Sequence, residues 1–177
     1  MSLQISDRVR ALGQQAQADL GGIFARIDAI AEENTQKVLS AFQKHRVAES
    51  YFAGTTGYGY DDLGRDKLDE IYADIFGTED ALVRVGFVNG THAISCALFG
   101  ALKPGETLVS AVGAPYDTLL GVIGVTNKGP GSLKDYGIQY RQVDLVDDEP
   151  DREGLAQAVR DPKVGAVLIQ RSRGYAT

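Results

Sequence analysis

Four segments of this sequence combine residue types that can bind an anion or a flat ring. The first runs from Phe87 to Ala93 and contains Asn-Gly-Thr-His. Here the pattern predicts that a strand ends, that Gly90 lets the backbone approach a ligand, and that Thr91 opens a helix. Amide groups and the helix dipole at such a point attract anions, so phosphate is the expected guest. The alternative is a plain turn with Asn89 or Thr91 as the N-cap.

The second segment, Gly113–Asp117, follows the next predicted strand. The carboxyl ends of strands are where ligands bind in α/β sheets. The Tyr116 ring could stack on a flat heterocycle there, and Pro115 would stiffen the turn. The alternative is an ordinary helix start in which Tyr116 covers apolar surface and Pro115 stands near the first helical position.

The third segment, Tyr51–Arg65, holds four glycines and four aromatic residues and shows no helical or alternating period. It is predicted to be a loop, and loops of this length are usually functional. Tyrosine hydroxyls and the Arg65 guanidinium suit recognition of phosphate or carboxylate. A structural Ω-loop filled by its own aromatic side chains is the alternative.

A fourth segment, Gln170–Tyr175, also follows a predicted strand, and its two arginines could hold an anion or pair with the acidic excess. Two single residues carry weaker signals. His92 stands in the first turn of a predicted helix, where it could lie over a ring or be solvated. Cys96, one turn further on, is expected to be a small packed residue.

Composition narrows the class of protein. The 177 residues are 44% hydrophobic and 24% charged with a net charge of −6, which is typical of a soluble globular protein and disfavours nucleic acid as a partner. One cysteine excludes an internal disulfide framework, and two histidines leave little for a zinc site. The absence of a long apolar run predicts no membrane span, no signal peptide and a cytoplasmic location.

The elements that must position these segments follow from apolar spacing. Residues 1–50 are predicted to form an N-terminal helical segment whose apolar stripe, from Ile23 to Phe42, packs on a body or on a partner subunit. A helix is predicted over residues 68–76, with Asp66 as its cap and Gly77 at its end.

From residue 81 onward, strands and helices alternate. The expected strands are 81–88, 107–110, 138–143 and 164–170, and the expected helices are 91–102, 116–125 and 153–159. Residues 103–106 fit a type II turn. The acidic run 144–151 is expected to be a solvated loop and helix start. The fold class is therefore α/β, with a mainly parallel sheet and flanking helices.

Five segments in this order resemble a known family. They are residues 56–66, 87–94, 113–119, 131–137 and 169–175. Together they are similar to the methionine γ-lyase-like proteins often labelled aluminium resistance protein. These are related to the cystathionine γ-synthase/β-lyase group of fold type I pyridoxal-phosphate enzymes. The resemblance covers the chain from about Tyr51 onward and implies that residues 51–177 are the first part of the cofactor-binding large domain.

The resemblance also implies roles. Gly90, Thr91 and His92 would form the cup for the phosphate of pyridoxal 5'-phosphate, and Tyr116 would stack on its ring and assist departure of the leaving group. The cofactor-binding residues contributed to the neighbouring subunit would be Tyr58, Tyr60 and Arg65. A homodimer would then be the smallest complete site, commonly paired into a homotetramer. The reaction implied is β- or γ-elimination from a sulfur-containing amino acid by a carbon–sulfur lyase.

In one respect the sequence departs from the family. The Schiff-base lysine and the acidic partner of the pyridine nitrogen come later in the family than residue 177, and none of the seven lysines here stands where the family places its own (Lys37, Lys44, Lys67, Lys103, Lys128, Lys134 and Lys163). The chain is thus expected to be an N-terminal portion that does not catalyse alone. The alternatives are a non-catalytic remnant that acts as an interaction partner, and a stand-alone α/β module that binds a phosphate ligand.

Overall fold

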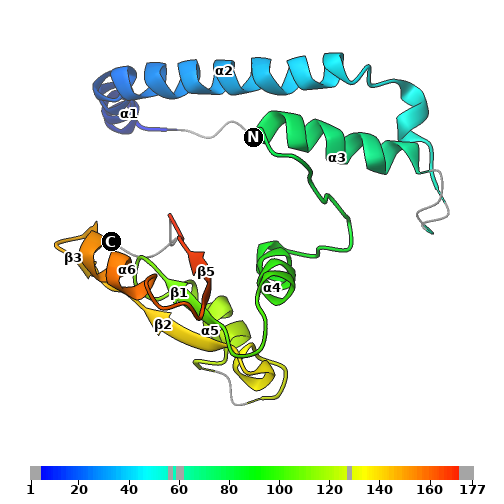
Figure 1. The fold of residues 1–177 in the computed structure, drawn as a ribbon. Helices are drawn as coiled ribbons and strands as arrows, with labels where there is room; N and C mark the ends of the chain where they lie inside the picture. Colours follow the sequence, from blue (N-terminus) through cyan, green and yellow to red (C-terminus); the bar gives the residue numbers. More distant parts are fainter. Residues whose placement is uncertain (1–4, 56–57, 59–61, 127–128, 172–177) are drawn as a thin grey trace. The chain divides into compact units, whose positions relative to one another are not determined.

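The computed structural model describes residues 5–55, 58, 62–126 and 129–171. It divides the chain into two units, Met1–Arg84 and Val85–Thr177 (Figure 1). The first is made of helices, and the second is a small parallel sheet with helices. The domain boundary after residue 50 that composition suggests lies inside the first unit and stays a prediction.

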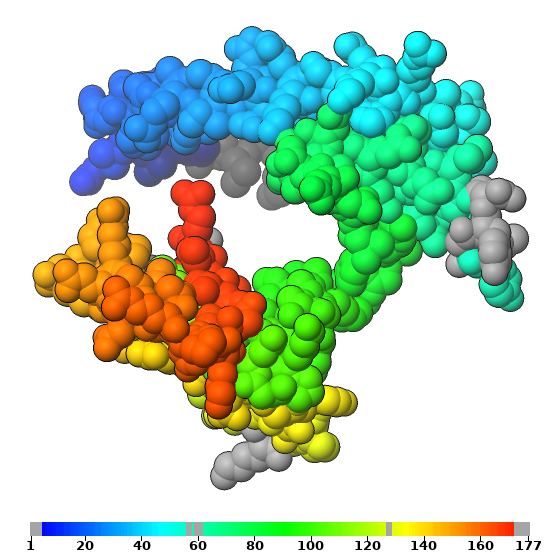
Figure 2. Space-filling model, viewed as in Figure 1, coloured from blue at the N-terminus to red at the C-terminus, as the bar shows by residue number. Residues whose placement is uncertain are grey.

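The helical unit contains α1 (Asp7–Asp19), α2 (Gly21–Lys44), the short 3-10 helix η1 (Glu49–Phe52) and α3 (Leu63–Phe76). The N-terminal helical segment is therefore confirmed, with a break at Leu20 between α1 and α2. The N-terminal half of α2 extends past α3 (Figures 1 and 2). No described helix is long and apolar enough to cross a membrane.

The start of α3 differs from the prediction. The helix begins at Leu63, and its N-cap is Asp62, whose Oδ1 accepts a hydrogen bond from the Arg65 N–H at 3.2 Å. Asp66 lies in the first turn and does not cap the helix. Both aspartates satisfy the cap preference, and the one that is buried, Asp62, takes the position. The predicted end is confirmed, since Gly77 has a left-handed φ of 65°.

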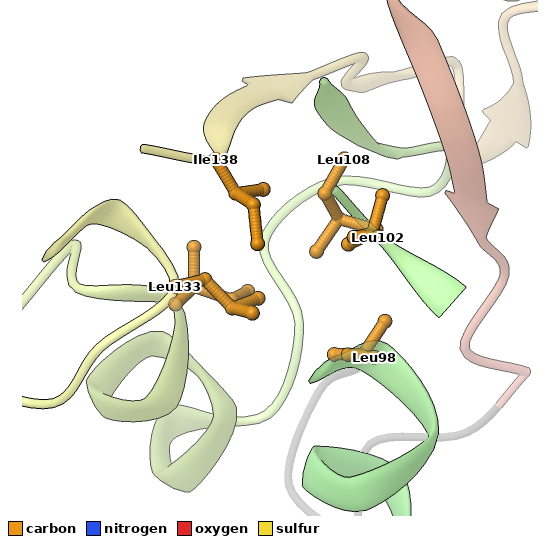
Figure 3. Packing of buried hydrophobic residues seen from close by; sticks show 6 residues of the cluster. Leu98, Leu102, Leu108, Leu133 and Ile138 are labelled. Carbon is orange, nitrogen blue, oxygen red and sulfur yellow. The ribbon is translucent and has the colours of Figure 1, made fainter. Parts of the chain in front are cut away.

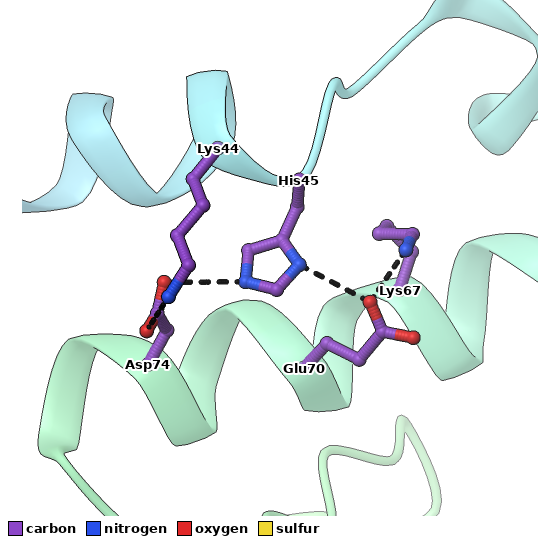
Figure 4. A network of polar contacts seen from close by, with 5 residues as sticks. All are labelled: Lys44, His45, Lys67, Glu70 and Asp74. Atoms are coloured by element: carbon purple, nitrogen blue, oxygen red, sulfur yellow. Dashed lines mark hydrogen bonds and ion pairs between the residues drawn. The ribbon is translucent and has the colours of Figure 1, made fainter.

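A polar network joins α2 to α3 (Figure 4). Lys44 Nζ lies 2.6 Å from Asp74 Oδ1. The two ring nitrogens of His45 lie 3.1 Å from Glu70 Oε2 and 3.2 Å from Asp74 Oδ2, and Lys67 pairs with Glu70. A neutral imidazole has a single N–H, so both histidine contacts are hydrogen bonds only when the ring is doubly protonated.

The sheet unit contains all the described strands. In chain order its elements are α4 (Gly90–Ala101), β1 (Thr107–Ser110), α5 (Asp117–Ile123), η2 (Lys134–Tyr136), β2 (Gln139–Gln142), β3 (Leu145–Val146), β4 (Glu149–Pro150), α6 (Arg152–Ala158) and β5 (Val164–Leu168). Strands β2, β1 and β5 form a parallel sheet in that order. The α/β class with a parallel sheet and flanking helices is confirmed.

The core lies on both faces of the central strand β1, because successive side chains of a strand point to opposite faces. Leu108 packs on one face in a cluster of six buried residues (Leu98, Leu102, Leu108, Ile123, Leu133 and Ile138; Figure 3). Val109 packs on the other face with Val143 and Ala158 of α6. The core thus fixes α4 and α5 against one face of the sheet and α6 against the other.

The prediction of a strand over residues 81–88 is wrong. This segment pairs with none of the described strands, and Val85 and Val88 are 98% and 78% exposed. The Val83 N–H donates instead to Asp69 Oδ1 of α3 at 2.7 Å. Its β-branched residues favour an extended chain, but a strand also needs a partner, and here a side chain takes the backbone donor.

In the acidic run 144–151, residues 144–150 are exposed as expected, but they also form a two-stranded hairpin of β3 and β4. Asp147 and Asp148 have φ values of 50° and 62°. Positive φ at both central residues matches the twist of hairpin strands, and aspartate tolerates that conformation better than most residues. Asp151 caps α6 through its contact with the Gly154 N–H at 2.8 Å.

Candidate functional site

The two segments that the sequence singles out around Thr91 and Tyr116 meet in space. Thr91 lies in the first turn of α4, and Tyr116 immediately precedes α5. The Oγ1 atom of Thr91 lies 2.8 Å from Oγ1 of Thr118, two residues after Tyr116. This hydrogen bond joins the beginnings of the two helices.

The same place lies at the carboxyl edge of the sheet. Strands β1 and β5 run parallel, and beyond their ends the Ala111 N–H donates to the Leu168 carbonyl at 2.9 Å. Two residues further on, Gln170 Oε1 accepts a hydrogen bond from the Tyr116 N–H at 2.9 Å. The fourth candidate segment therefore contributes its first residue here, while Ser172–Tyr175 lie outside the described residues.

The start of α4 presents hydrogen-bond donors to solvent. Asn89 caps the helix: its Oδ1 accepts from the His92 N–H at 2.8 Å, and its carbonyl accepts from the Ala93 N–H at 3.1 Å. The prediction that Asn89 could be the N-cap of this helix is confirmed. Within the described part of the chain, the amides of Gly90 and Thr91 have no acceptor, and a Cβ built on Gly90 meets nothing within 4 Å. Two such amides beside open space can hold an anion.

His92 has a different environment from its two neighbours. Its amide is engaged by Asn89, its Nδ1 lies 3.4 Å from the Val88 N–H, and its ring lies edge-on to Phe87 at 5.8 Å between centroids. The phosphate-binding role predicted for His92 stays a prediction. Cys96, on the same helix, is exposed. The prediction that this residue is packed is therefore wrong, because it stands on a face of α4 that the sheet does not cover.

Tyr116 is held by its backbone and is half-buried. It occupies the N-cap position of α5, after the buried Pro115, and Asp117 lies in the first turn. Asp117 Oδ1 accepts from the Thr118 N–H at 2.7 Å. These bonds fix the first turn of α5, and so fix where the Tyr116 side chain leaves the backbone.

The segment Tyr51–Arg65, predicted to be a loop, belongs to the helical unit, and its first and last residues are part of η1 and α3. Tyr58 is 83% exposed, and Tyr60 lies outside the described residues. The Arg65 guanidinium pairs with Asp62 at 3.0 Å, and Thr55 donates to the same carboxylate at 3.0 Å. The contribution of Tyr58, Tyr60 and Arg65 to a neighbouring subunit stays a prediction.

Thr118 is the residue of this site that sequence reasoning missed. The signal available was its position, in the first turn of a helix that directly follows a candidate ring-binding residue. Its partner stands 27 residues earlier in the chain, and only the packing of α4 against α5 brings the two hydroxyl groups together.

Comparison with known proteins assigns the chain to a family. The family model described as methionine gamma-lyase matches residues 9–177. The chain belongs to the methionine gamma-lyase family. The motif resemblance noted in the sequence is therefore confirmed at the level of the family.

Solved structures of relatives agree with this assignment to the family. A carbon–sulfur lyase involved in aluminum resistance from Clostridium novyi NT is 50% identical, with a TM-score of 0.91 over 96% of this chain and 41% of its own. A candidate cystathionine beta-lyase involved in aluminum resistance from Clostridium acetobutylicum is 47% identical, with a TM-score of 0.92 over 97% of this chain and 41% of its own.

Among curated proteins, YnbB of Bacillus subtilis (strain 168) is 46% identical over 177 residues, which is 99% of this chain and 42% of YnbB. The chain thus spans about two fifths of the length of the relatives it matches.

Proposed function

We propose that the protein to which this chain belongs is a pyridoxal-phosphate-dependent carbon–sulfur lyase of fold type I. Its substrate would be a sulfur-containing amino acid. In this proposal, residues 51–177 form the first part of the large domain that binds the cofactor. Membership of the methionine gamma-lyase family supports it, as does the naming of the Clostridium novyi relative as a carbon–sulfur lyase.

The observation that carries the proposal is the hydrogen bond between Thr91 and Thr118. It brings the amides of Gly90 and Thr91, which have no acceptor among the described residues, next to the segment that carries Tyr116. A phosphorylated pyridine needs an anion-binding group and a flat surface, and in this proposal the two amides supply the first and the Tyr116 ring the second. The amides and the Thr91 hydroxyl would hold the phosphate ester, while the Tyr116 ring would lie against the pyridine ring.

When bound, the cofactor supplies an electron sink that permits β- or γ-elimination from an amino acid. The chain's own residues bind and orient. Gly90 and Thr91 anchor the ester end, and Tyr116 carries a phenol that can give a proton to the departing sulfur atom. This chemistry also needs a lysine and an acidic residue. We expect both in the part of the full-length protein that follows residue 177.

A second copy of the chain is the proposed partner. Tyr58, Tyr60 and Arg65 would then reach the cofactor phosphate of the neighbouring subunit in a homodimer or homotetramer. The exposed apolar stripe of α2 supports an interface, because Ile23, Phe24, Ile27 and Ile30 are 44–53% exposed.

Light scattering tests the partner. Ile27→Lys (I27K) adds a charge to the stripe, and Gln36→Lys (Q36K) adds the same charge on the opposite side of α2. The expected result is a lower molar mass for I27K alone. Equal masses for the wild type and I27K would contradict an interface at the stripe.

Absorption spectroscopy tests the activity. The full-length protein with added pyridoxal 5'-phosphate is expected to show the visible band of the bound cofactor and to release ammonia and a 2-oxo acid from a sulfur-containing amino acid. Thr91→Val (T91V) removes a hydroxyl that would donate to the phosphate ester, and it is expected to weaken cofactor binding. Thr126→Val (T126V), at an exposed threonine after α5, is the control and is expected to leave cofactor binding unchanged.

The alternatives give other results. No band and no ligand binding would support the non-catalytic remnant. Binding of phosphate esters without any aldehyde chemistry would support the stand-alone phosphate-binding module.

A further inference from the structure

We infer that Thr118 is a positioning residue for the anion that α4 binds: it donates its hydroxyl hydrogen to Thr91 and thereby aims the Thr91 hydroxyl at the ligand. This inference rests on the proposed function, in which the ligand is a phosphate ester. Neither the family match nor the motif resemblance assigns a role to Thr118.

Hydrogen counting carries the first step. Two threonine hydroxyls have two hydrogens, and the contact of 2.8 Å between Thr91 and Thr118 uses one of them. The other hydrogen belongs to the accepting hydroxyl. Among the described residues, no group outside the pair accepts this second hydrogen. The pair therefore keeps one hydroxyl donor for a ligand.

Location decides which hydroxyl keeps that donor. Thr91 belongs to the first turn of α4, beside the amides of Gly90 and Thr91 that have no acceptor among the described residues. An anion held by those amides attracts the nearest hydroxyl hydrogen, which is that of Thr91. Thr118 must then be the donor within the pair. A hydroxyl that both accepts and donates is also polarised and donates more strongly.

The backbone around Thr118 is built to hold this direction. Asp117 Oδ1 accepts from the Thr118 N–H at 2.7 Å. Gln170 Oε1 accepts from the Tyr116 N–H at 2.9 Å. These two hydrogen bonds fix the backbone amides on both sides of Asp117. The only remaining freedom of the Thr118 hydroxyl is rotation about its own side-chain bonds.

The experiment separates the ester from the rest of the ligand. In the full-length protein, Thr118→Val (T118V) keeps the shape of the side chain and removes its hydroxyl, and Thr118→Ser (T118S) keeps the hydroxyl. Equilibrium binding is measured with pyridoxal 5'-phosphate and with pyridoxal, which lacks the phosphate. T126V is the matched threonine-to-valine control.

The expected result is about fivefold weaker binding of pyridoxal 5'-phosphate by T118V, the equivalent of one ordinary hydrogen bond. T118S and T126V should bind it within about twofold of the wild type. Pyridoxal should bind T118V as it binds the wild type. A merely structural role would weaken both ligands, so only the phosphate-specific loss supports positioning.

Each other outcome overturns a defined statement. Unchanged binding of pyridoxal 5'-phosphate by T118V overturns the role of Thr118 and leaves the proposed function intact, and so does equal weakening of both ligands. A wild-type protein that binds neither ligand overturns the proposed function, and the inference with it. If T118V does not fold, Thr118→Ala (T118A) replaces it in the same comparison with T118S.

Discussion

The sheet unit and the helical unit are stabilised by different kinds of contact. In the sheet unit, Leu108, Ile123 and Leu133 are at most 1% exposed and lie in one cluster. In the described part of the helical unit, the buried hydrophobic residues are Ala41 and Ile71 alone. The sheet unit thus has an apolar core of its own, whereas the described part of the helical unit leaves most of its large apolar side chains exposed.

The helical unit relies instead on polar contacts. Lys44 and His45 join the end of α2 to two carboxylates of α3, and Lys67 pairs with one of these carboxylates within α3 (Figure 4). Asp62 connects the chain before α3 to the helix itself. The difference teaches that the apolar pattern of a sequence has two uses. In β1 it builds a core, and in α2 it leaves a row of apolar side chains exposed.

The largest expected effect is in the sheet core. Leu108→Ala (L108A) empties a site that is 0% exposed and should lower the free energy of unfolding by about 2–5 kcal/mol. Ile27→Ala (I27A) on α2, where the side chain is 53% exposed, should change it by no more than about 0.5 kcal/mol in the monomer. Urea unfolding followed by circular dichroism measures both. A similar loss in the two variants would remove the contrast between the units.

The next effect tests the polar support of the helical unit. Asp62 is 6% exposed and accepts from Thr55, from the Arg65 amide and from the Arg65 guanidinium. Asp62→Ala (D62A) should lower the free energy of unfolding by about 1–3 kcal/mol, because it removes a helix cap and the hydrogen bonds that a charged carboxylate accepts. Asp66→Ala (D66A), at the exposed first turn of the same helix, is the control and should stay within about 0.5 kcal/mol. Thermal melts of the two variants that coincide would show that Asp62 gives no special support.

Local signals predicted the parts of the fold that depend on neighbours in the chain. Strand β1 over residues 107–110 and the helix end at Gly77 were both predicted. The turn before β1 has the expected positive φ at Gly105, 91°. Each needs only a short apolar run or a residue that tolerates its backbone conformation.

What the sequence could not predict depends on distant residues. Residues 81–88 look like a strand, but their partner is the side chain of Asp69 and not another strand. In the same way, Gly90, Thr91 and Tyr116 could be named as candidates because each stands at a strand end or a helix start. Their proximity depends on Thr118 and Gln170, which meet them through tertiary packing.

A third prediction separates stability from binding in the sheet unit. Asn89→Ala (N89A) removes the cap of α4 and should lower the free energy of unfolding by about 1 kcal/mol. It also releases the His92 amide, which adds a donor to those of Gly90 and Thr91. Binding of pyridoxal 5'-phosphate, measured by titration calorimetry well below the melting temperature, should therefore not weaken. Parallel losses of stability and affinity would mean that the cap itself shapes the site.

The smallest expected effect is the acid sensitivity of the polar network. The hydrogen bond from Lys67 lowers the pKa of Glu70 below its ordinary value of 4.5, and the hydrogen bond from Lys44 lowers the pKa of Asp74 below 3.8. A carboxyl group whose pKa is lowered by folding stabilises the fold above its unfolded pKa, and that stability is lost as the pH falls through the folded pKa. The α2–α3 contact should therefore weaken from about pH 4.5 downward, and the melting temperature should fall by only a few degrees, because exposed ion pairs contribute little.

A double variant assigns that loss to the helical unit. The pKa of Asp135 in the sheet unit is also lowered, by hydrogen bonds from Ser132, so acid weakens both units and the wild type alone cannot separate them. In Glu70→Gln with Asp74→Asn (E70Q/D74N), the helical contribution is absent at every pH, while Asp135 still titrates. Melts of the variant should start lower near neutral pH and then decline less steeply than those of the wild type. If the two declines are equally steep, the acid sensitivity lies outside this network, and the helical unit owes less to its polar contacts than the comparison with the sheet unit implies.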